Sequence, residues 1–342
     1  MPILYFPPAR KRLFESTYCP PDCMIPTGDT QAYKLAPQKF RWVYNKLTVA
    51  ELQGLKCGPH AIAPDEQYPI FSKPLLNLWG LGTAARVIET PEEYWQTIMP
   101  GHMWCTLLSG KHYSTDIAVA AGKPVWFSHS IGVPGPRQTF DYWEVNVAVE
   151  DYVQANLAAF VEAHLSEYTG MLNVESIGGK IIEIHLRFTS QWPDLYGPWF
   201  LPSLVGLYCN KGWTGPETQG QTGYSVALFD DEKYAPVGTT ISSETLQEME
   251  KAFDVSSIVV DYDPAVPLES WPRPAGGFRL AAINGFDLEK CMVARQIFQK
   301  YLHDMYNNQE TVDVKTWMKD GTQVLHEQKV VAFDTLKANA TH

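Results

Sequence analysis

The stretch LNVESIGGKIIEIHLRF, from Leu172 to Phe188, carries an unusual set of side chains for a short β-hairpin. Two strand-like runs flank Gly178-Gly179. Their charged or ionisable groups are Glu175, Glu183, His185 and Arg187. Directly opposed residues of an antiparallel pair point to the same face, so the length of the turn decides whether these groups meet.

Two turn lengths suit the paired glycines. A two-residue loop pairs Ile177 with Lys180 and sends Glu175 and Glu183 to opposite faces. A three-residue loop pairs Ile177 with Ile181 and sets the two carboxylates opposite each other. Opposed carboxylates repel, and a divalent cation such as Mg²⁺ between them makes this register favourable. The alternative is an edge hairpin whose charges face water.

Composition narrows the class of protein. The chain has 342 residues, 45% hydrophobic and 13% aromatic, enough for a sizeable core in two or three lobes. Its formal net charge of −11 argues against a broad nucleic-acid surface, which has to be basic. No apolar run approaches the ~20 residues of a membrane span. Cys19 and Cys23 lack a second pair to complete a zinc site, so reduced cysteines are expected. We therefore expect a cytoplasmic protein without nucleic-acid or membrane partners.

Periodicity and capping signals predict the surrounding elements. Helices are expected over residues 39–55, from Thr90 onward and over 149–170, with strands at 68–76, 103–108, 223–231 and 256–263. A hairpin that turns at Ala121-Gly122 is expected over 109–132. Residues 1–38 are rich in turn formers and predict irregular structure. The segment 277–303 predicts a strand, a turn at Asn284-Gly285 and a helix.

Several short motifs follow one another in an order that resembles the ATP-grasp superfamily. They are Asn45-Lys46; YPIFSKP with Lys73; NLWGLGTA; MWCTLL; GKHYSTDIAVAAGKPV; and Glu175 followed by EIHLR. Each motif is common alone, so the order carries the resemblance, over roughly residues 40–190. It implies an α+β ATP-grasp fold, in which two lobes grip a nucleotide. The expected divisions are an irregular segment 1–40, a first lobe 41–110, a second lobe 111–210, a C-terminal α+β subdomain 211–305 and a polar tail 306–342.

The resemblance assigns nucleotide contacts to several residues. Lys46 and Lys73 are expected at the ATP phosphates, where a compact ammonium acts as a point charge. For Lys46 taken alone, a solvated surface lysine is the more ordinary interpretation. Gly80 and Gly82 would let a loop approach the phosphates, unless that loop is an ordinary turn. Backbone groups near Cys105 and Leu107 would contact adenine.

The same resemblance assigns the metal and phosphoryl groups. Glu175 and Glu183 would hold Mg²⁺, and Arg187 would steady the transferred phosphate or the acyl phosphate. His185 replaces the usual asparagine. It can ligate a metal and favour Mn²⁺, contact phosphate or substrate, or simply pack in its strand.

Two further departures from the family pattern concern the substrates. His112 stands where a glutamate usually binds the ribose; an imidazole can take that role, or Asp116 can. The N-terminal segment is shorter than the domain that usually precedes this fold, so the acceptor site is expected to be built differently. Trp192 and Asp194 are candidate acceptor contacts and Arg279 a candidate carboxylate contact. Aromatic packing and a structural arginine are the alternatives.

The function that follows from the resemblance is an ADP-forming ligase. ATP would phosphorylate a small-molecule carboxylate, and an amine, or less often a thiol, would attack the acyl phosphate. No Ser-His-Asp or Cys-His motif suggests a protein nucleophile, which agrees with attack by the substrate itself. Two other functions stay open: a kinase that stops at phosphoryl transfer, and a degenerate protein that binds a nucleotide or a partner without turnover.

Overall fold

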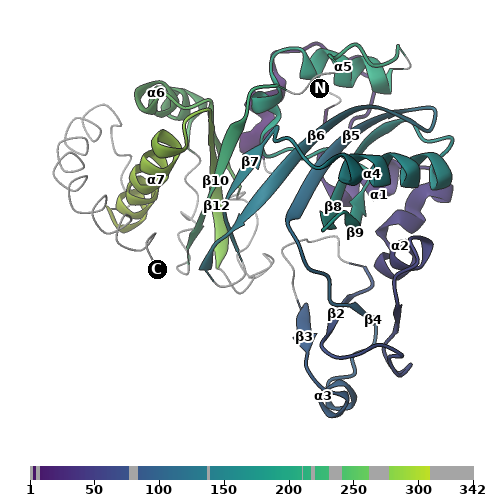
Figure 1. The fold of residues 1–342 in the computed structure, drawn as a ribbon. Coiled ribbons are helices and arrows are strands. Elements are labelled where there is room, and N and C mark those ends of the chain that lie inside the picture. The colour runs from purple at the N-terminus through teal and green to yellow at the C-terminus, as the bar shows by residue number, and fades with distance from the viewer. Residues whose placement is uncertain are drawn as a thin grey trace.

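The computed structural model describes residues 3–4, 8–76, 84–136, 139–209, 211–216, 220–230, 241–261 and 277–308. Within them the chain forms a small and a large antiparallel sheet (Figure 1). The small sheet lies at one end of the molecule, and the helices cover both faces of the large one. The mixed helices and antiparallel strands confirm the α+β class.

The small sheet has the strand order β1-β4-β2-β3. Its strands are β1 (Cys57–Pro59), β2 (Ile70–Pro74), β3 (Arg86–Ile88) and β4 (His102–Thr106). Helix α3 (Pro91–Gln96) begins as predicted, with Thr90 Oγ1 accepting a hydrogen bond from Glu93 N at 3.2 Å. The core between sheet and helix consists of Ile70, Ile88, Tyr94 and Trp104.

The large sheet has the order β11-β12-β10-β7-β6-β5-β8-β9. Its strands are β5 (His112–Ala120), β6 (Lys123–Pro134), β7 (Phe140–Val145), β8 (Gly170–Ile177), β9 (Lys180–His185), β10 (Gly223–Asp230), β11 (Ser257–Val260) and β12 (Phe278–Gly285). Strand β10 pairs with β7, for example Tyr224 with Glu144. The second lobe and the C-terminal subdomain expected from the sequence therefore share one continuous sheet.

Three groups of helices bury the faces of this sheet. Helix α4 (Asp151–His164) packs Leu157 among Ile117 and Leu172. It ends before the expected glycine, since Gly170 already belongs to β8. On the opposite face, η4 (Pro193–Tyr196) and α5 (Phe200–Tyr208) cover Trp126. Helices α6 (Ser243–Phe253) and α7 (Leu288–Asn308) cover β10, β11 and β12.

The N-terminal segment is more ordered than the sequence predicts. It contains the 3-10 helix η1 (Pro8–Phe14) and helix α1 (Asp29–Leu35), where irregular structure was expected. Phe14 is fully buried against Phe188. Arg12 forms an ion pair with Glu250 and donates to Ile258 O at 2.6 Å. The segment is thereby fixed to the far end of the large sheet.

The link between the lobes passes close to the turn of the β8–β9 hairpin. Gly178 N donates to Lys111 O at 3.1 Å. Gly110 has a φ of +121°, and a Cβ on it would lie 2.9 Å from Gly178 Cα. A Cβ on Gly178 would lie 2.5 Å from Ser109 O. Both positions therefore require glycine, because two backbones touch there.

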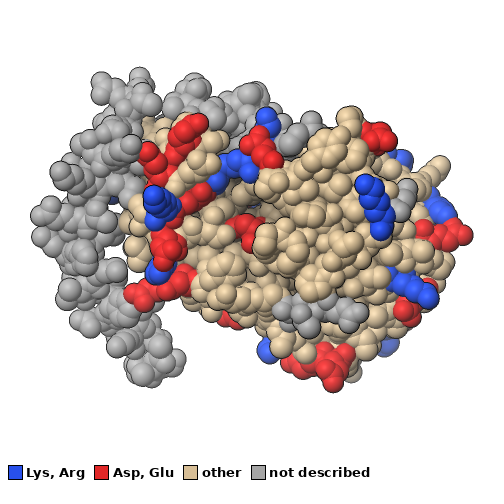
Figure 2. Space-filling model, turned by 90° about the horizontal axis from the view of Figure 1, so that it is seen from above, with Lys and Arg blue, Asp and Glu red and all other residues tan. Residues whose placement is uncertain are grey.

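No helix among the described residues is both long and apolar enough to cross a membrane. Figure 2 shows one face of the molecule, where the lysine and arginine side chains of the described residues are interspersed with acidic ones and form no continuous basic patch.

Candidate functional site

The β8–β9 hairpin brings the two predicted carboxylates opposite each other. Glu175 pairs with Glu183 across the strands. The turn, however, has two residues, because Ile177 pairs with Lys180 and not with Ile181. A register shift after Glu175, a β-bulge, supplies the extra residue that a longer turn would have provided. The opposition of the carboxylates is confirmed, and the three-residue loop expected to produce it is wrong.

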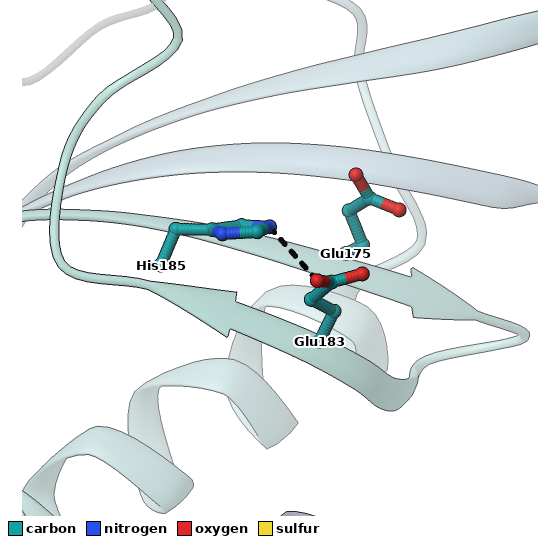
Figure 3. A group of neighbouring side chains, drawn as sticks. All are labelled: Glu175, Glu183 and His185. Carbon is teal, nitrogen blue, oxygen red and sulfur yellow. Dashed lines mark ion pairs between the residues drawn. The ribbon is translucent and has the colours of Figure 1, made fainter. Parts of the chain in front are cut away.

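His185 completes a group that fits a divalent metal ion. One ligand atom from each of Glu175, Glu183 and His185 lies within 4.8 Å of the other two. His185 Nε2 faces Glu183 Oε1 at 3.6 Å, and the three side chains converge on one side of the hairpin (Figure 3). Two carboxylates suit Mg²⁺, and the added imidazole also suits Mn²⁺. Among the described residues this is the one group of three or more such ligands.

Lys46 reaches this group from the start of helix α2 (Lys46–Leu52). The sequence predicted one helix here, but the 3-10 helix η2 (Gln38–Tyr44) stops before Asn45, whose side chain caps α2 by accepting from Leu47 N and Thr48 N. The change of direction at Asn45, between η2 and α2, places Lys46 Nζ 2.9 Å from Glu183 Oε2, and both side chains are largely buried. The Asn-Lys motif therefore combines a helix cap with the ammonium that follows it.

Lys73 reaches the same hairpin from the small lobe. Its ammonium donates to the carbonyl oxygen of Ile182 at 2.9 Å, and 7% of the residue is exposed. Burial is the largest influence on its pKa and lowers it, because a buried ammonium loses its hydration. Within the described part of the chain the Ile182 carbonyl is its one hydrogen-bond partner, and the carboxylates of Glu183 and Glu175 act on its charge electrostatically.

His112 lies beside Glu175. Its Nε2 is 3.2 Å from Glu175 Oε2, and the rings of Phe140 and Trp143 pack against the imidazole. Burial raises the pKa of Glu175, but the hydrogen bond with His112 and the electrostatic interactions with His112, His185 and Lys46 outweigh burial and lower the pKa to about 2. The hairpin carboxylate is thus held in its charged form.

Asp29 belongs to the site although the sequence analysis did not identify it. It accepts from His185 Nδ1 at 2.9 Å and from Arg187 Nε and Nη2 at 3.0 and 2.9 Å. Burial raises its pKa, but the charge of Arg187, followed by that of His185, holds the pKa well below the usual range. A single aspartate after Gly28 matches no motif, so local sequence gave no signal for it.

Asp116 lies on the same sheet face but is occupied by other partners. Its carboxylate accepts from Asn173 Nδ2, Thr189 N and the Tyr196 hydroxyl, at 2.8 Å each. Cys105 is buried in β4, whereas Leu107 is partly exposed in the link that follows. Gly80 and Gly82, and the tail after residue 308, lie outside the described residues.

The candidate substrate residues gather near β11 and β12. Trp192 is buried and donates to the Tyr196 hydroxyl at 2.8 Å. Asp194 accepts from Ser257 Oγ at 2.9 Å and from Asn284 Nδ2 at 3.1 Å, and burial raises its pKa. Trp192 also packs against Trp143 of β7, as the alternative of aromatic packing expected, and a substrate contact of Trp192 or Asp194 stays a prediction.

Arg279 is the most accessible of this second group. It forms an ion pair with Asp261, donates to Gln191 Oε1 at 3.2 Å, and keeps 32% of its side chain exposed. Arg10, which the sequence analysis missed, shares Asp261 and donates to Ser190 Oγ at 2.7 Å. Burial and the positive charges of Arg279 and Arg187 lower the pKa of Arg10 to about 9.

The chain resembles known proteins in its structure and not in its sequence. No protein-family model and no curated protein matches the sequence. The structure matches an L-amino acid ligase from Bacillus licheniformis (TM-score 0.54, 13% identity, 86% of this chain and 82% of that one). It also matches an N5-carboxyaminoimidazole ribonucleotide synthetase from Thermotoga maritima (0.52, 11%, 85% and 82%). A third match is a carboxyaminoimidazole ribonucleotide synthase from Aspergillus clavatus solved with ATP (0.52, 12%, 79% and 75%). The chain therefore has the α+β ATP-grasp fold that its motif order resembles.

Proposed function

We propose that this protein is an ATP-dependent ligase that activates a small-molecule carboxylate as an acyl phosphate for attack by an amine. The observation that carries the proposal is the convergence of two ammonium groups, two carboxylates and an imidazole on one hairpin. They come from three separate parts of the chain: Lys46 on α2, Lys73 on β2, and Glu175, Glu183 and His185 on β8 and β9. Three solved proteins of this fold are ligases or synthases by name, and one of them was solved with ATP.

The two lysines would bind the phosphates. Lys46 already neutralises Glu183, so it can exchange that carboxylate for a phosphate oxygen. Lys73 has a carbonyl as its hydrogen-bond partner and gains a counter-ion when a phosphate binds. Mg²⁺ or Mn²⁺ held by the hairpin group would neutralise charge that spreads over the transferred phosphoryl group.

The carboxylate substrate would bind towards the arginines. Arg10, Arg187 and Arg279 lie near enough to one another that their charges lower the pKa of Arg10 and of Arg279, after the larger effect of burial; the pKa of Arg279 falls to about 10. Asp261 is shared by Arg10 and Arg279, and Asp29 pairs with Arg187, so the three guanidinium groups outnumber these two carboxylates. Guanidinium groups match the geometry of a carboxylate or a phosphate. Arg279 is the proposed contact for the acid, with the amine pocket beside Trp192 and Asp194.

A thermal-shift experiment tests nucleotide binding. Mg²⁺-ATP at a hundredfold excess over its Kd stabilises a protein by about 2.7 kcal/mol, so the melting midpoint should rise clearly. Glu183→Gln should reduce this rise, because it removes a metal ligand and the partner of Lys46. Glu167→Gln is the control, since Glu167 is an exposed partner of Lys39. No rise in the wild type at millimolar Mg²⁺-ATP would refute the proposal.

A second measurement tests the reaction. Release of ADP from ATP should require a carboxylic acid and an amine together, and Lys73→Met should abolish it. ADP release with the acid alone, accompanied by a stable phosphorylated product, would replace the ligase proposal with a kinase. Nucleotide binding without ADP release across a panel of acid–amine pairs would favour a binding protein.

A further inference from the structure

Asp29 connects the metal group to the phosphoryl-binding arginine. Its side chain is 10% exposed and comes from the first residue of α1, outside the sheet that carries the other groups. Oδ1 contacts both His185 Nδ1 and Arg187 Nε, and Oδ2 contacts Arg187 Nη2. One carboxylate therefore fixes two side chains that would otherwise turn independently.

We propose that Asp29 is a positioning residue, which orients His185 as a metal ligand and Arg187 as a donor to the phosphoryl group. The inference rests on the proposed function, because it assumes a metal–nucleotide site at the hairpin. Asp29 would act through these two residues and not by touching the substrate.

The orientation of His185 follows from the chemistry of its partner. An ionised carboxylate only accepts hydrogen bonds, so Nδ1 carries the proton that faces Asp29. In the neutral imidazole, Nε2 then keeps its lone pair and points at Glu183 Oε1, 3.6 Å away. Two acceptors that face each other at this distance are stabilised by a cation between them. Carboxylates behind metal-ligating histidines have the same effect elsewhere, and their loss typically weakens metal binding 10- to 100-fold.

The orientation of Arg187 follows from which of its nitrogen atoms remain available. Asp29 occupies Nε and Nη2, which form one edge of the guanidinium fork. Nη1 has two weaker contacts, with Asn173 Oδ1 at 3.4 Å and Phe188 O at 3.5 Å. The remaining donors are the two N–H groups of Nη1 and the second N–H of Nη2, so Arg187 would reach a phosphate through the end of the fork and not through the edge that Asp29 holds.

The test measures Mn²⁺ binding to the full chain by electron paramagnetic resonance, with and without ADP. Asp29→Asn should weaken Mn²⁺ binding 10- to 100-fold and reduce the spin-echo modulation from a directly coordinated imidazole nitrogen. Glu250→Gln is the matched control: it breaks another buried ion pair of the N-terminal segment, with Arg12, and leaves the metal group intact. This control should bind Mn²⁺ like the wild type.

Three results would overturn the inference, and they differ in what else they refute. Equal Mn²⁺ binding by wild type and Asp29→Asn refutes the positioning role alone. Tighter ATP binding by Asp29→Asn also refutes it, because Asp29 would then block the arginine. If neither Mn²⁺ nor Mg²⁺-ATP binds to the wild type, both the inference and the proposed function fail.

A measurement on the wild type covers the case in which Asp29→Asn does not fold. A long-range ¹⁵N spectrum of the histidine-labelled protein reports which ring nitrogen carries the proton. The His185 signal, identified by its loss in His185→Gln, should show the Nδ1–H tautomer. The Nε2–H tautomer would contradict the proposed orientation.

Discussion

Methionine in place of Lys46 is expected to lower the stability of the nucleotide-free protein, whereas methionine in place of Lys73 is expected to leave it unchanged or raise it. Both lysines are 7% exposed and both contact the β8–β9 hairpin, but their partners differ. Lys46 neutralises the carboxylate of Glu183 at 2.9 Å, whereas Lys73 is hydrogen-bonded to the carbonyl of Ile182. Methionine has a similar length and no charge, so a comparison of the two variants isolates the contribution of each lysine's charge to stability.

Lys46→Met leaves Glu183 beside Glu175 without its cation. Breaking one side of a buried ion pair costs about 3–5 kcal/mol, and the lower figure suits a glutamate with 15% of its side chain exposed. The entropy of unfolding is about 2.1 cal/mol/K per residue, or about 0.7 kcal/mol/K for 342 residues. For unfolding as one unit, about 3 kcal/mol lowers the melting midpoint by about 4 °C.

Lys73→Met removes a buried charge together with its desolvation penalty. A hydrogen bond to a charged group contributes about 1.5–3 kcal/mol, and desolvating an ion costs several kcal/mol, so the variant should be as stable as the wild type or more so. Burial lowers the pKa of Lys73, so in alkaline solution the unfolded chain binds more protons than the native one. Wild-type stability should therefore rise relative to Lys73→Met as the pH increases towards about 10.4, the usual pKa of lysine.

The assay is thermal unfolding followed by circular dichroism at several pH values. Lys290→Met is the control, because its pair with Asp254 is exposed to solvent and should not change the midpoint. The double variant Lys46→Met/Glu183→Gln should recover most of the loss, since no uncompensated charge remains. A Lys46→Met midpoint equal to that of the wild type, or a Lys73→Met midpoint several degrees lower, would refute the electrostatic reasoning.

Two further predictions concern the backbone and pH. Gly178→Ala should lower the melting midpoint and weaken nucleotide binding, because the added methyl group collides with the link between the lobes. Gly54 is the control, since it has a similar positive φ and no atom within 4 Å of an added Cβ. Gly54→Ala should lower the midpoint by less and leave nucleotide binding unchanged. Because Arg187 and His185 hold the pKa of Asp29 below its usual range despite burial, its stabilising effect is present above about pH 4 and is lost as the pH falls further. The gap between the midpoints of wild type and Asp29→Asn should therefore narrow steadily as the pH falls below about 4, and a gap of the same size at pH 4 and at pH 2 would contradict this.

The sequence was sufficient to predict the opposition of Glu175 and Glu183 but not the way it arises. A glycine pair indicates a turn without fixing its length, and the bulge depends on contacts that periodicity does not contain. The order of the motifs along the chain, more than any single motif, singled out the two lysines that the structure places beside the hairpin, and their expected contact with ATP phosphates stays a prediction.

The residues that were missed act over long sequence separations. Asp29 meets His185 and Arg187 across more than 150 positions, and Arg10 meets Ser190 across 180. Single charged residues in a turn-rich segment look like ordinary surface residues until the fold brings their partners to them. The same limitation explains why β10, β11 and β12 were not assigned to the sheet of the hairpin.

The contact of η1 with the far edge of the sheet has a consequence for synthesis on the ribosome. Arg12 finds its partner Glu250 only after 238 further residues have been made, and its second acceptor, Ile258 O, comes later still. Until then the nascent chain exposes both the arginines of its first helix and the sheet edge that they will cover. Docking of η1 therefore comes late in synthesis, after β11 has been made, and it closes a contact of high sequence separation.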